Sequence, residues 1–79
     1  MKVNVFVTLK KGVLDPQGKA IKGSLAKLGY KEVKDVRLGK FIELEVENIP
    51  EVELKAKIEE MSKKLLANTV IEDFKYEIK

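Results

Sequence analysis

The chain has 79 residues, of which 44% are hydrophobic and 37% are charged, and its formal net charge is +3. This length excludes a two-domain enzyme, and the mixture of apolar and charged residues predicts a folded chain. The sequence contains no Cys, His or Trp, which excludes disulfide scaffolds, Cys/His zinc sites and catalysis by a thiol or an imidazole.

The N-terminal part of the sequence predicts a strand. Residues 2–10 alternate between apolar and mostly polar side chains, with Val3, Val5 and Val7 on one face and Phe6 on the other. A period of two residues is typical of a strand with one buried face. We therefore expect this segment to lie against the core.

A helix is predicted next. Asp15 supplies an N-cap oxygen, Pro16 presets the backbone of the first helical residue, and Gly29 suits the left-handed conformation that ends many helices. Gly18 and Gly23 weaken this helix by up to about 1 kcal/mol each relative to alanine, so packing must hold it. Its apolar stripe consists of Ala20, Ile21, Leu25 and Leu28.

The second half of the chain predicts two strands, a helix and a last strand. Residues 30–47 return to a period of two, as two strands or one bent strand. Gly39 within them fits a hairpin turn, which we prefer, or a bulge, because glycine tolerates positive φ. A helix begins at Pro50, and its surface carries four Glu→Lys pairs spaced four residues apart. Asn68 is a cap or a turn residue, and residues 70–78 form the last strand. The apolar residues of the second helix are Leu54, Ile58, Met61 and Leu65.

The order of these elements, β-α-β-β-α-β, predicts one α+β domain spanning residues 1–79 with a ferredoxin-like plait. In this plait a four-stranded antiparallel sheet, ordered 4-1-3-2, carries both helices on one face. The other face is then bare, and it presents Phe6 and Phe41 on the two central strands. A domain this small buries little surface, so we expect self-association through this face or through an edge strand. The alternative is that both are ordinary exposed aromatic side chains.

The charges are unevenly distributed along the chain. Residues 1–40 carry ten basic and three acidic side chains, and residues 41–79 carry six basic and ten acidic ones. Such a field can steer association with a complementary surface, including a second copy of the chain or a phosphorylated ligand. The alternative is that these side chains only solvate exposed faces.

Catalytic and ligand-binding motifs are absent from the sequence. No phosphate-binding loop, nucleotide-binding turn or nucleophile motif is present, and we propose no metal site. An RNA-binding surface would need aromatic side chains on the central strands, which Phe6 and Phe41 supply. Glu43, Glu45 and Glu47 lie beside them and would repel a phosphate backbone, so no nucleic-acid partner is expected. No segment predicts a membrane span or a signal peptide, and we expect a cytoplasmic protein.

Two polar positions are candidate contact sites. Arg37 is the only arginine, and its planar fork suits a carboxylate or phosphate on a ligand or partner. An ion pair with Asp35 is the alternative. Asn68 and Thr69 are either a polar contact point or a cap and turn.

Three stretches together resemble one family. VLDPQGKAI at 13–21, VKDVRLGKFIELEVE at 33–47 and KLLANTVIEDFKYEI at 64–78 resemble PurS, the small subunit of phosphoribosylformylglycinamidine synthase. The resemblance covers essentially the whole chain. The matching positions are Asp15, Pro16 and Gly18, then Arg37, Gly39, Lys40 and Glu43, and finally Asn68, Thr69, Ile71 and Glu72.

The resemblance implies a role without bond chemistry in this chain. It implies the plait fold, a homodimer or homotetramer, and a cytoplasmic complex with a large synthetase subunit and a glutaminase subunit in purine biosynthesis. It also implies that the large subunit binds ATP and magnesium, and that this chain binds no cofactor. The chain would bridge the other two subunits and support ammonia transfer. Arg37, Lys40, Asn68 and Thr69 are the candidate subunit contacts. The alternative hypothesis is a stand-alone ferredoxin-like module that binds a small ligand or RNA.

Overall fold

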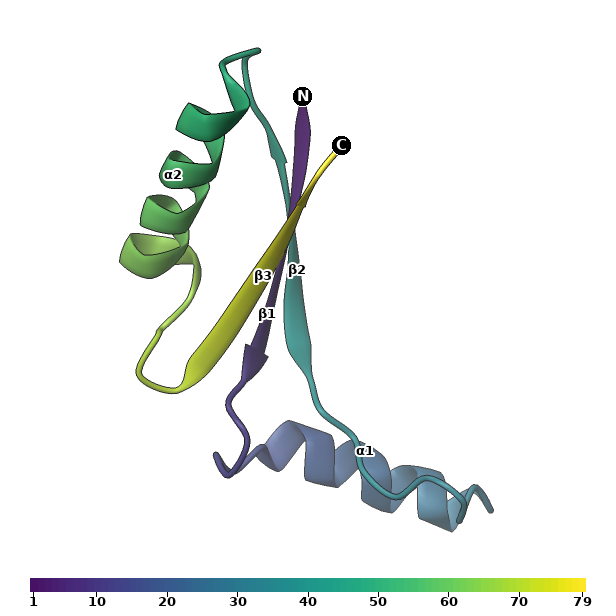
Figure 1. Cartoon of the computed structure of the whole chain (residues 1–79). Coiled ribbons are helices and arrows are strands. Elements are labelled where there is room, and N and C mark those ends of the chain that lie inside the picture. Colours follow the sequence, from purple (N-terminus) through teal and green to yellow (C-terminus); the bar gives the residue numbers. More distant parts are fainter.

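The computed structural model describes all residues from 1 to 79 (Figure 1). Three strands, two α-helices and one π-helical turn follow one another along the chain. Their bounds are β1 Lys2–Leu9, α1 Pro16–Lys27, β2 Gly39–Glu45, α2 Glu51–Met61, the π-helical turn η1 Ser62–Leu66, and β3 Glu72–Ile78. Neither helix combines the length and the hydrophobicity needed to cross a bilayer.

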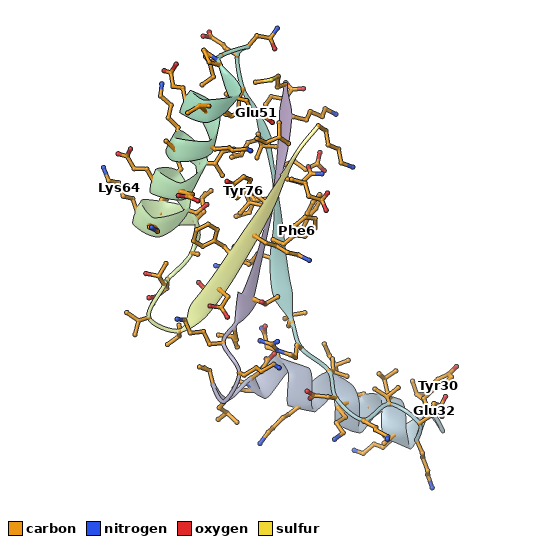
Figure 2. The ribbon with its side chains drawn as sticks, in the orientation of Figure 1. Phe6, Tyr30, Glu32, Glu51, Lys64 and Tyr76 are labelled. Atoms are coloured by element: carbon orange, nitrogen blue, oxygen red, sulfur yellow. The ribbon has the colours of Figure 1, made fainter.

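The sheet has three antiparallel strands in the order β2-β1-β3. The predicted N-terminal strand is confirmed as the central one, and its alternation is preserved. Val3, Val5 and Val7 are fully buried on one face, while Phe6 on the opposite face lies across from Phe41 in β2. Figure 2 shows Tyr76 on the side of the sheet that faces α2 and Phe6 on the other side.

The core lies between the valine face of the sheet and α2. Leu54 and Ile58 of α2 are fully buried against it, and Ala67, which follows η1, is buried in the same cluster. Two of the four predicted Glu→Lys pairs form on the exposed surface of the helical segment, Glu53–Lys57 at 3.3 Å and Glu60–Lys64 at 2.7 Å.

The end of the second helix departs from the predicted apolar stripe. The wide π-helical turn η1 shifts the side chains, so that Ser62 is buried and Leu65 is 82% exposed. The hydroxyl of Ser62 has no hydrogen-bond partner. The turn therefore leaves Leu65 available on the surface.

Helix α1 begins and ends where the sequence predicts, but it does not pack on the sheet. Figure 1 shows α1 extending away from the base of the sheet, with the following segment running back along it. Gly18 is its only buried residue. The molecule measures 49 × 25 × 15 Å, and its radius of gyration is 16.0 Å, whereas a compact chain of this length would have one of about 12 Å.

The predicted four-stranded sheet and its hairpin are wrong. Residues 30–38 form no strand, so the predicted second strand is missing from the order 4-1-3-2 and only one helix covers the sheet. The backbone of this segment bonds to α1 and its cap instead, with the Tyr30 amide donating to Leu25 O and the Leu38 amide to Asp15. Gly39 lacks the positive φ of a hairpin turn, and it begins β2 opposite Thr8.

Candidate functional site

The structure brings together no group of acidic side chains that could hold a metal ion. The candidate functional features are therefore surfaces and the contacts that shape them. Four features stand out, namely the attachment of α1, a polar network at one end of the sheet, the aromatic face and an apolar cleft.

Asp15 attaches α1 to the chain that returns from it. One carboxylate oxygen accepts the Gly18 amide at 2.8 Å, and the other accepts the Leu38 amide at 2.9 Å. We call this arrangement of Asp15, Gly18 and Leu38 the Asp15 clasp. The Leu38 amide, and then the Gly18 amide, hold the pKa of the Asp15 carboxyl below its ordinary value. A β-carbon on Gly18 would collide with Val36 O and lie 2.8 Å from Asp15 Oδ2, so glycine permits the close approach.

Asp15→Asn should loosen the clasp at neutral pH and matter less in acid. The folded pKa of Asp15 lies below the ordinary value of 3.8. The stability that the carboxylate contributes is therefore present above that ordinary value and is lost as the pH falls through the folded value. Hydrogen exchange at the Leu38 amide measures the effect. Protection should be greater in the wild type than in Asp15→Asn at about pH 7, and the difference should shrink as the pH falls below the ordinary value of 3.8.

The matched control for this experiment is Asp35→Asn. The Asp35 carboxylate accepts only the adjacent Val36 amide, at 2.9 Å, so its loss should leave the protection of Leu38 unchanged. Equal protection of Leu38 in the wild type and Asp15→Asn at neutral pH would contradict the role of the clasp.

Two of the predicted contact residues, Lys40 and Asn68, both contact the carboxylate of Glu72. Lys40 at the start of β2 lies 4.0 Å from the Glu72 carboxylate at the start of β3. The Glu72 carboxylate also accepts a hydrogen bond from the backbone N–H of Asn68 at 2.7 Å, and Asn68 Oδ1 accepts one from the backbone N–H of Val70 at 3.2 Å. The structure therefore joins Lys40 and Asn68 in one network and gives Asn68 its predicted turn role.

Arg37 and Thr69 lie outside this network. Both are exposed. Arg37 forms none of the ion pairs of the chain, and the predicted pair with Asp35 is absent. It lines a shallow cleft of about 480 Å³ beside Lys10, Lys11 and Lys19, where Asp15 and Asp35 also contribute acidic side chains. The guanidinium is therefore free to contact another molecule.

Phe6 and Phe41 form an aromatic pair on the face of the sheet opposite α2. Their ring centroids are 5.1 Å apart, and the Lys75 ammonium lies 5.4 Å from the centroid of Phe6. Phe41 remains 55% exposed. The predicted bare face therefore exists, with an aromatic centre.

An apolar cleft between β2 and α2 was not predicted from the sequence. It has a volume of about 810 Å³ and lies on the same face of the sheet as α2, since its lining residue Leu44 is the strand partner of the buried Val3. No motif in the sequence marks this cleft. The sequence indicated only that the first helix, weakened by its glycines, must pack against some apolar surface. The cleft is lined by Leu44, Val46, Ile49, Leu54, Met61, Leu65 and Leu66, together with Glu45, Glu47, Lys57, Glu60 and Lys64.

Comparisons with known proteins identify relatives along the whole chain. The family PurS, described as phosphoribosylformylglycinamidine (FGAM) synthase, matches residues 2–79. Phosphoribosylformylglycinamidine synthase subunit PurS of Bacillus subtilis is 52% identical over 77 residues, which cover 98% of this chain and 90% of that protein. The PurS subunit of Methanocaldococcus jannaschii is 49% identical over 78 residues, covering 99% and 92%.

Solved structures resemble the chain just as fully. The structure of PurS from B. subtilis superposes with a TM-score of 0.89 and 51% identity, covering 99% of this chain and 96% of that one. A chain in the structure of PurLQS from Thermotoga maritima superposes with a TM-score of 0.87 and 32% identity, covering 96% and 93%. Residues 16–38 make up more than a quarter of the chain. Such scores therefore require the extended α1 in those structures as well.

Proposed function

The chain belongs to the PurS family, and from this membership we propose that it is the small, noncatalytic subunit of phosphoribosylformylglycinamidine synthase in purine biosynthesis. The enzyme is a ligase that uses glutamine as the amide donor. We place ATP and magnesium on the large synthetase subunit, glutamine hydrolysis on the glutaminase subunit, and the complex in the cytoplasm. The observation that carries this proposal is the match over residues 2–79.

The proposed role is to hold the two catalytic subunits in register so that ammonia passes between them. Ammonia is mostly protonated in neutral water, and ammonium is not a nucleophile, so a short enclosed path preserves its reactivity. The shape of the chain supports this role, because its long α1 and its sheet offer separate surfaces to different partners. The likeness to a chain of the T. maritima PurLQS structure supports it further.

We propose Arg37, Lys40, Asn68 and Thr69 as contacts with the other subunits. The exposed Arg37 guanidinium is unpaired within the chain, which leaves its planar fork available for a partner carboxylate or phosphate. Lys40 and the backbone of Asn68 both contact the Glu72 carboxylate, which supports their grouping as one contact surface. We also propose that the chain works as a homo-oligomer, a dimer or a tetramer, with Phe6 and Phe41 as one contact between copies.

Reconstitution tests the function. Glutamine-dependent synthesis of the formylglycinamidine ribonucleotide should appear only when this chain, the large subunit and the glutaminase are mixed. Full glutamine-dependent turnover without the chain, or turnover by the chain alone, would contradict the proposal. Binding of RNA or a small metabolite by the chain alone, with no effect on the mixture, would favour the stand-alone module.

The same mixtures test the role of Arg37. A charge-assisted hydrogen bond contributes about 1.5 to 3 kcal/mol, so Arg37→Ala should raise the dissociation constant of the complex by about 10- to 100-fold. Isothermal titration calorimetry measures this constant, and Lys34→Ala, another exposed cation in the same segment, is the control. Equal dissociation constants for the wild type and Arg37→Ala would make Arg37 a bystander.

A further inference from the structure

We propose that the basic cleft beside Arg37 is a binding site for a phosphate group, carried by a small metabolite or present as the free anion. The cleft lies where the chain leaves β1, begins α1 and returns from it. Its volume is about 480 Å³, which is within the range of small-molecule sites, about 300 to 1,000 Å³. The inference goes beyond the proposed function and does not rest on it, because it concerns a ligand of this chain by itself.

Basic side chains from three segments line the cleft. Lys10 and Lys11 follow β1, Lys19 lies near the start of α1, and Arg37 belongs to the segment that returns from α1. Phosphate-binding motifs that can be read from a sequence place their donors within one short stretch. Here the donors are distant in the sequence, and the fold brings them to one cleft.

Three of these four cations are unpaired within the chain. Lys11, Lys19 and Arg37 are exposed and form no ion pair, whereas Lys10 lies 3.8 Å from the Asp73 carboxylate. Like charges that share a cleft repel one another. An anion that contacts two or more of them relieves this repulsion, so the cleft attracts an anion.

The two acidic side chains of the cleft, Asp15 and Asp35, are engaged by backbone amides. Asp15 accepts the Gly18 and Leu38 amides at 2.8 and 2.9 Å, and Asp35 accepts the Val36 amide at 2.9 Å. Neither forms an ion pair with a cation of the cleft. Because four basic side chains accompany these two acidic ones, the cleft keeps an excess of positive charge.

The Asp15 clasp fixes the backbone beside Arg37 before any ligand binds. Arg37 directly precedes Leu38, whose amide the clasp holds 2.9 Å from the Asp15 carboxylate. Figure 1 shows the returning segment lying along α1, so the two sides of the cleft are connected by the clasp. A site that is positioned in advance loses less conformational entropy when its ligand binds.

The donors of the cleft match a phosphate group better than a carboxylate or an RNA strand. A phosphate monoester carries a charge of about −1.5 to −2 at pH 7 and three acceptor oxygens, so it can bind the planar fork of Arg37 and a lysine together. One carboxylate has two oxygens and a single charge, which the arginine alone satisfies. No aromatic side chain lines the cleft for a base to stack on. Leu9, Val13 and Leu14 also line the cleft and suit the carbon part of a small phosphate ester.

Titration of the whole chain with ribose 5-phosphate at constant ionic strength, followed by heteronuclear NMR, tests the proposal. The amide signals of Lys11 and Arg37 should shift and saturate, and ribose without phosphate should leave them unchanged. Inorganic phosphate identifies the source of the group, since equal affinity indicates the free anion and lower affinity indicates the ester. Succinate, a dianion without phosphate, should bind about 10-fold more weakly than the better phosphate ligand.

Arg37→Ala should weaken the binding of ribose 5-phosphate by about 10- to 100-fold, and Lys11→Ala should weaken it by about 10-fold. Lys34→Ala is the matched control. Lys34 is an exposed cation of the returning segment that does not line the cleft, so its loss should leave the affinity unchanged. Circular dichroism verifies that each variant is folded.

Four results would each overturn the proposal. They are the lack of a saturable shift with either phosphate ligand, equal shifts with ribose, succinate binding as tight as phosphate, and equal affinities of Arg37→Ala and Lys34→Ala. Lys11→Ala reports on the cleft without changing a proposed subunit contact. Reconstitution of glutamine-dependent synthesis with the wild-type chain reports on the proposed function, so the two failures are distinguishable.

Discussion

Leu54→Ala should destabilise the folded chain by about 2 to 5 kcal/mol, because it removes a fully buried side chain from a small core. Only six hydrophobic residues are buried, and α2 contributes two of them, Leu54 and Ile58. A domain of this length has a total stability of about 4 to 12 kcal/mol. The substitution therefore removes a large part of it, and urea unfolding followed by circular dichroism measures the loss.

Val52→Ala is the control for this prediction. Val52 lies on the same helix and is 84% exposed, so its truncation should change the free energy of unfolding by less than about 0.5 kcal/mol. Both variants are compared at one protein concentration, since self-association adds to the apparent stability. A loss below about 1 kcal/mol in Leu54→Ala would show that the contact between α2 and the sheet is not the main source of stability.

The same substitution should have opposite effects at two glycines of α1. Gly18→Ala forces a methyl group against Val36 O and Asp15 Oδ2, so it should open the Asp15 clasp and cost about 1 to 3 kcal/mol. At Gly23 a β-carbon meets nothing within 4 Å. Gly23→Ala should therefore stabilise α1 by about 0.5 to 1 kcal/mol through helix propensity.

One measurement separates these variants. Hydrogen exchange at the Leu38 amide should speed up in Gly18→Ala and stay unchanged or slow down in Gly23→Ala. A Gly18→Ala variant with wild-type exchange at Leu38 would show that the backbone can shift and that glycine is not required there.

Most elements were predictable because their signals are local. The alternation of Val3, Val5 and Val7 placed β1, the capping by Asp15 and Pro16 placed α1, and the helical spacing of Leu54 and Ile58 placed α2. Each of these patterns depends on residues close together in the sequence. The aromatic face at Phe6 followed directly from the alternation of β1.

There is a physical reason why the edge of the sheet and the position of α1 could not be predicted from the sequence. Val36 and Leu38 alternate like a strand, but a strand also needs partner groups for its backbone, and here Asp15 takes the Leu38 amide. The apolar stripe of α1 predicts that another apolar surface covers it. Because the hydrophobic effect is not directional, the stripe does not predict which surface that is.

The pairing of β1 with β3 affects how the chain acquires its structure. Val3 lies opposite Ile78 in the ladder. During synthesis β1 therefore leaves the ribosome first, but one of its two edges stays without hydrogen-bond partners until β3 has been made. Contacts between such distant residues slow the search for the native state. During that interval the valine row of the nascent chain is uncovered, and we expect final folding to follow the release of the C-terminal strand.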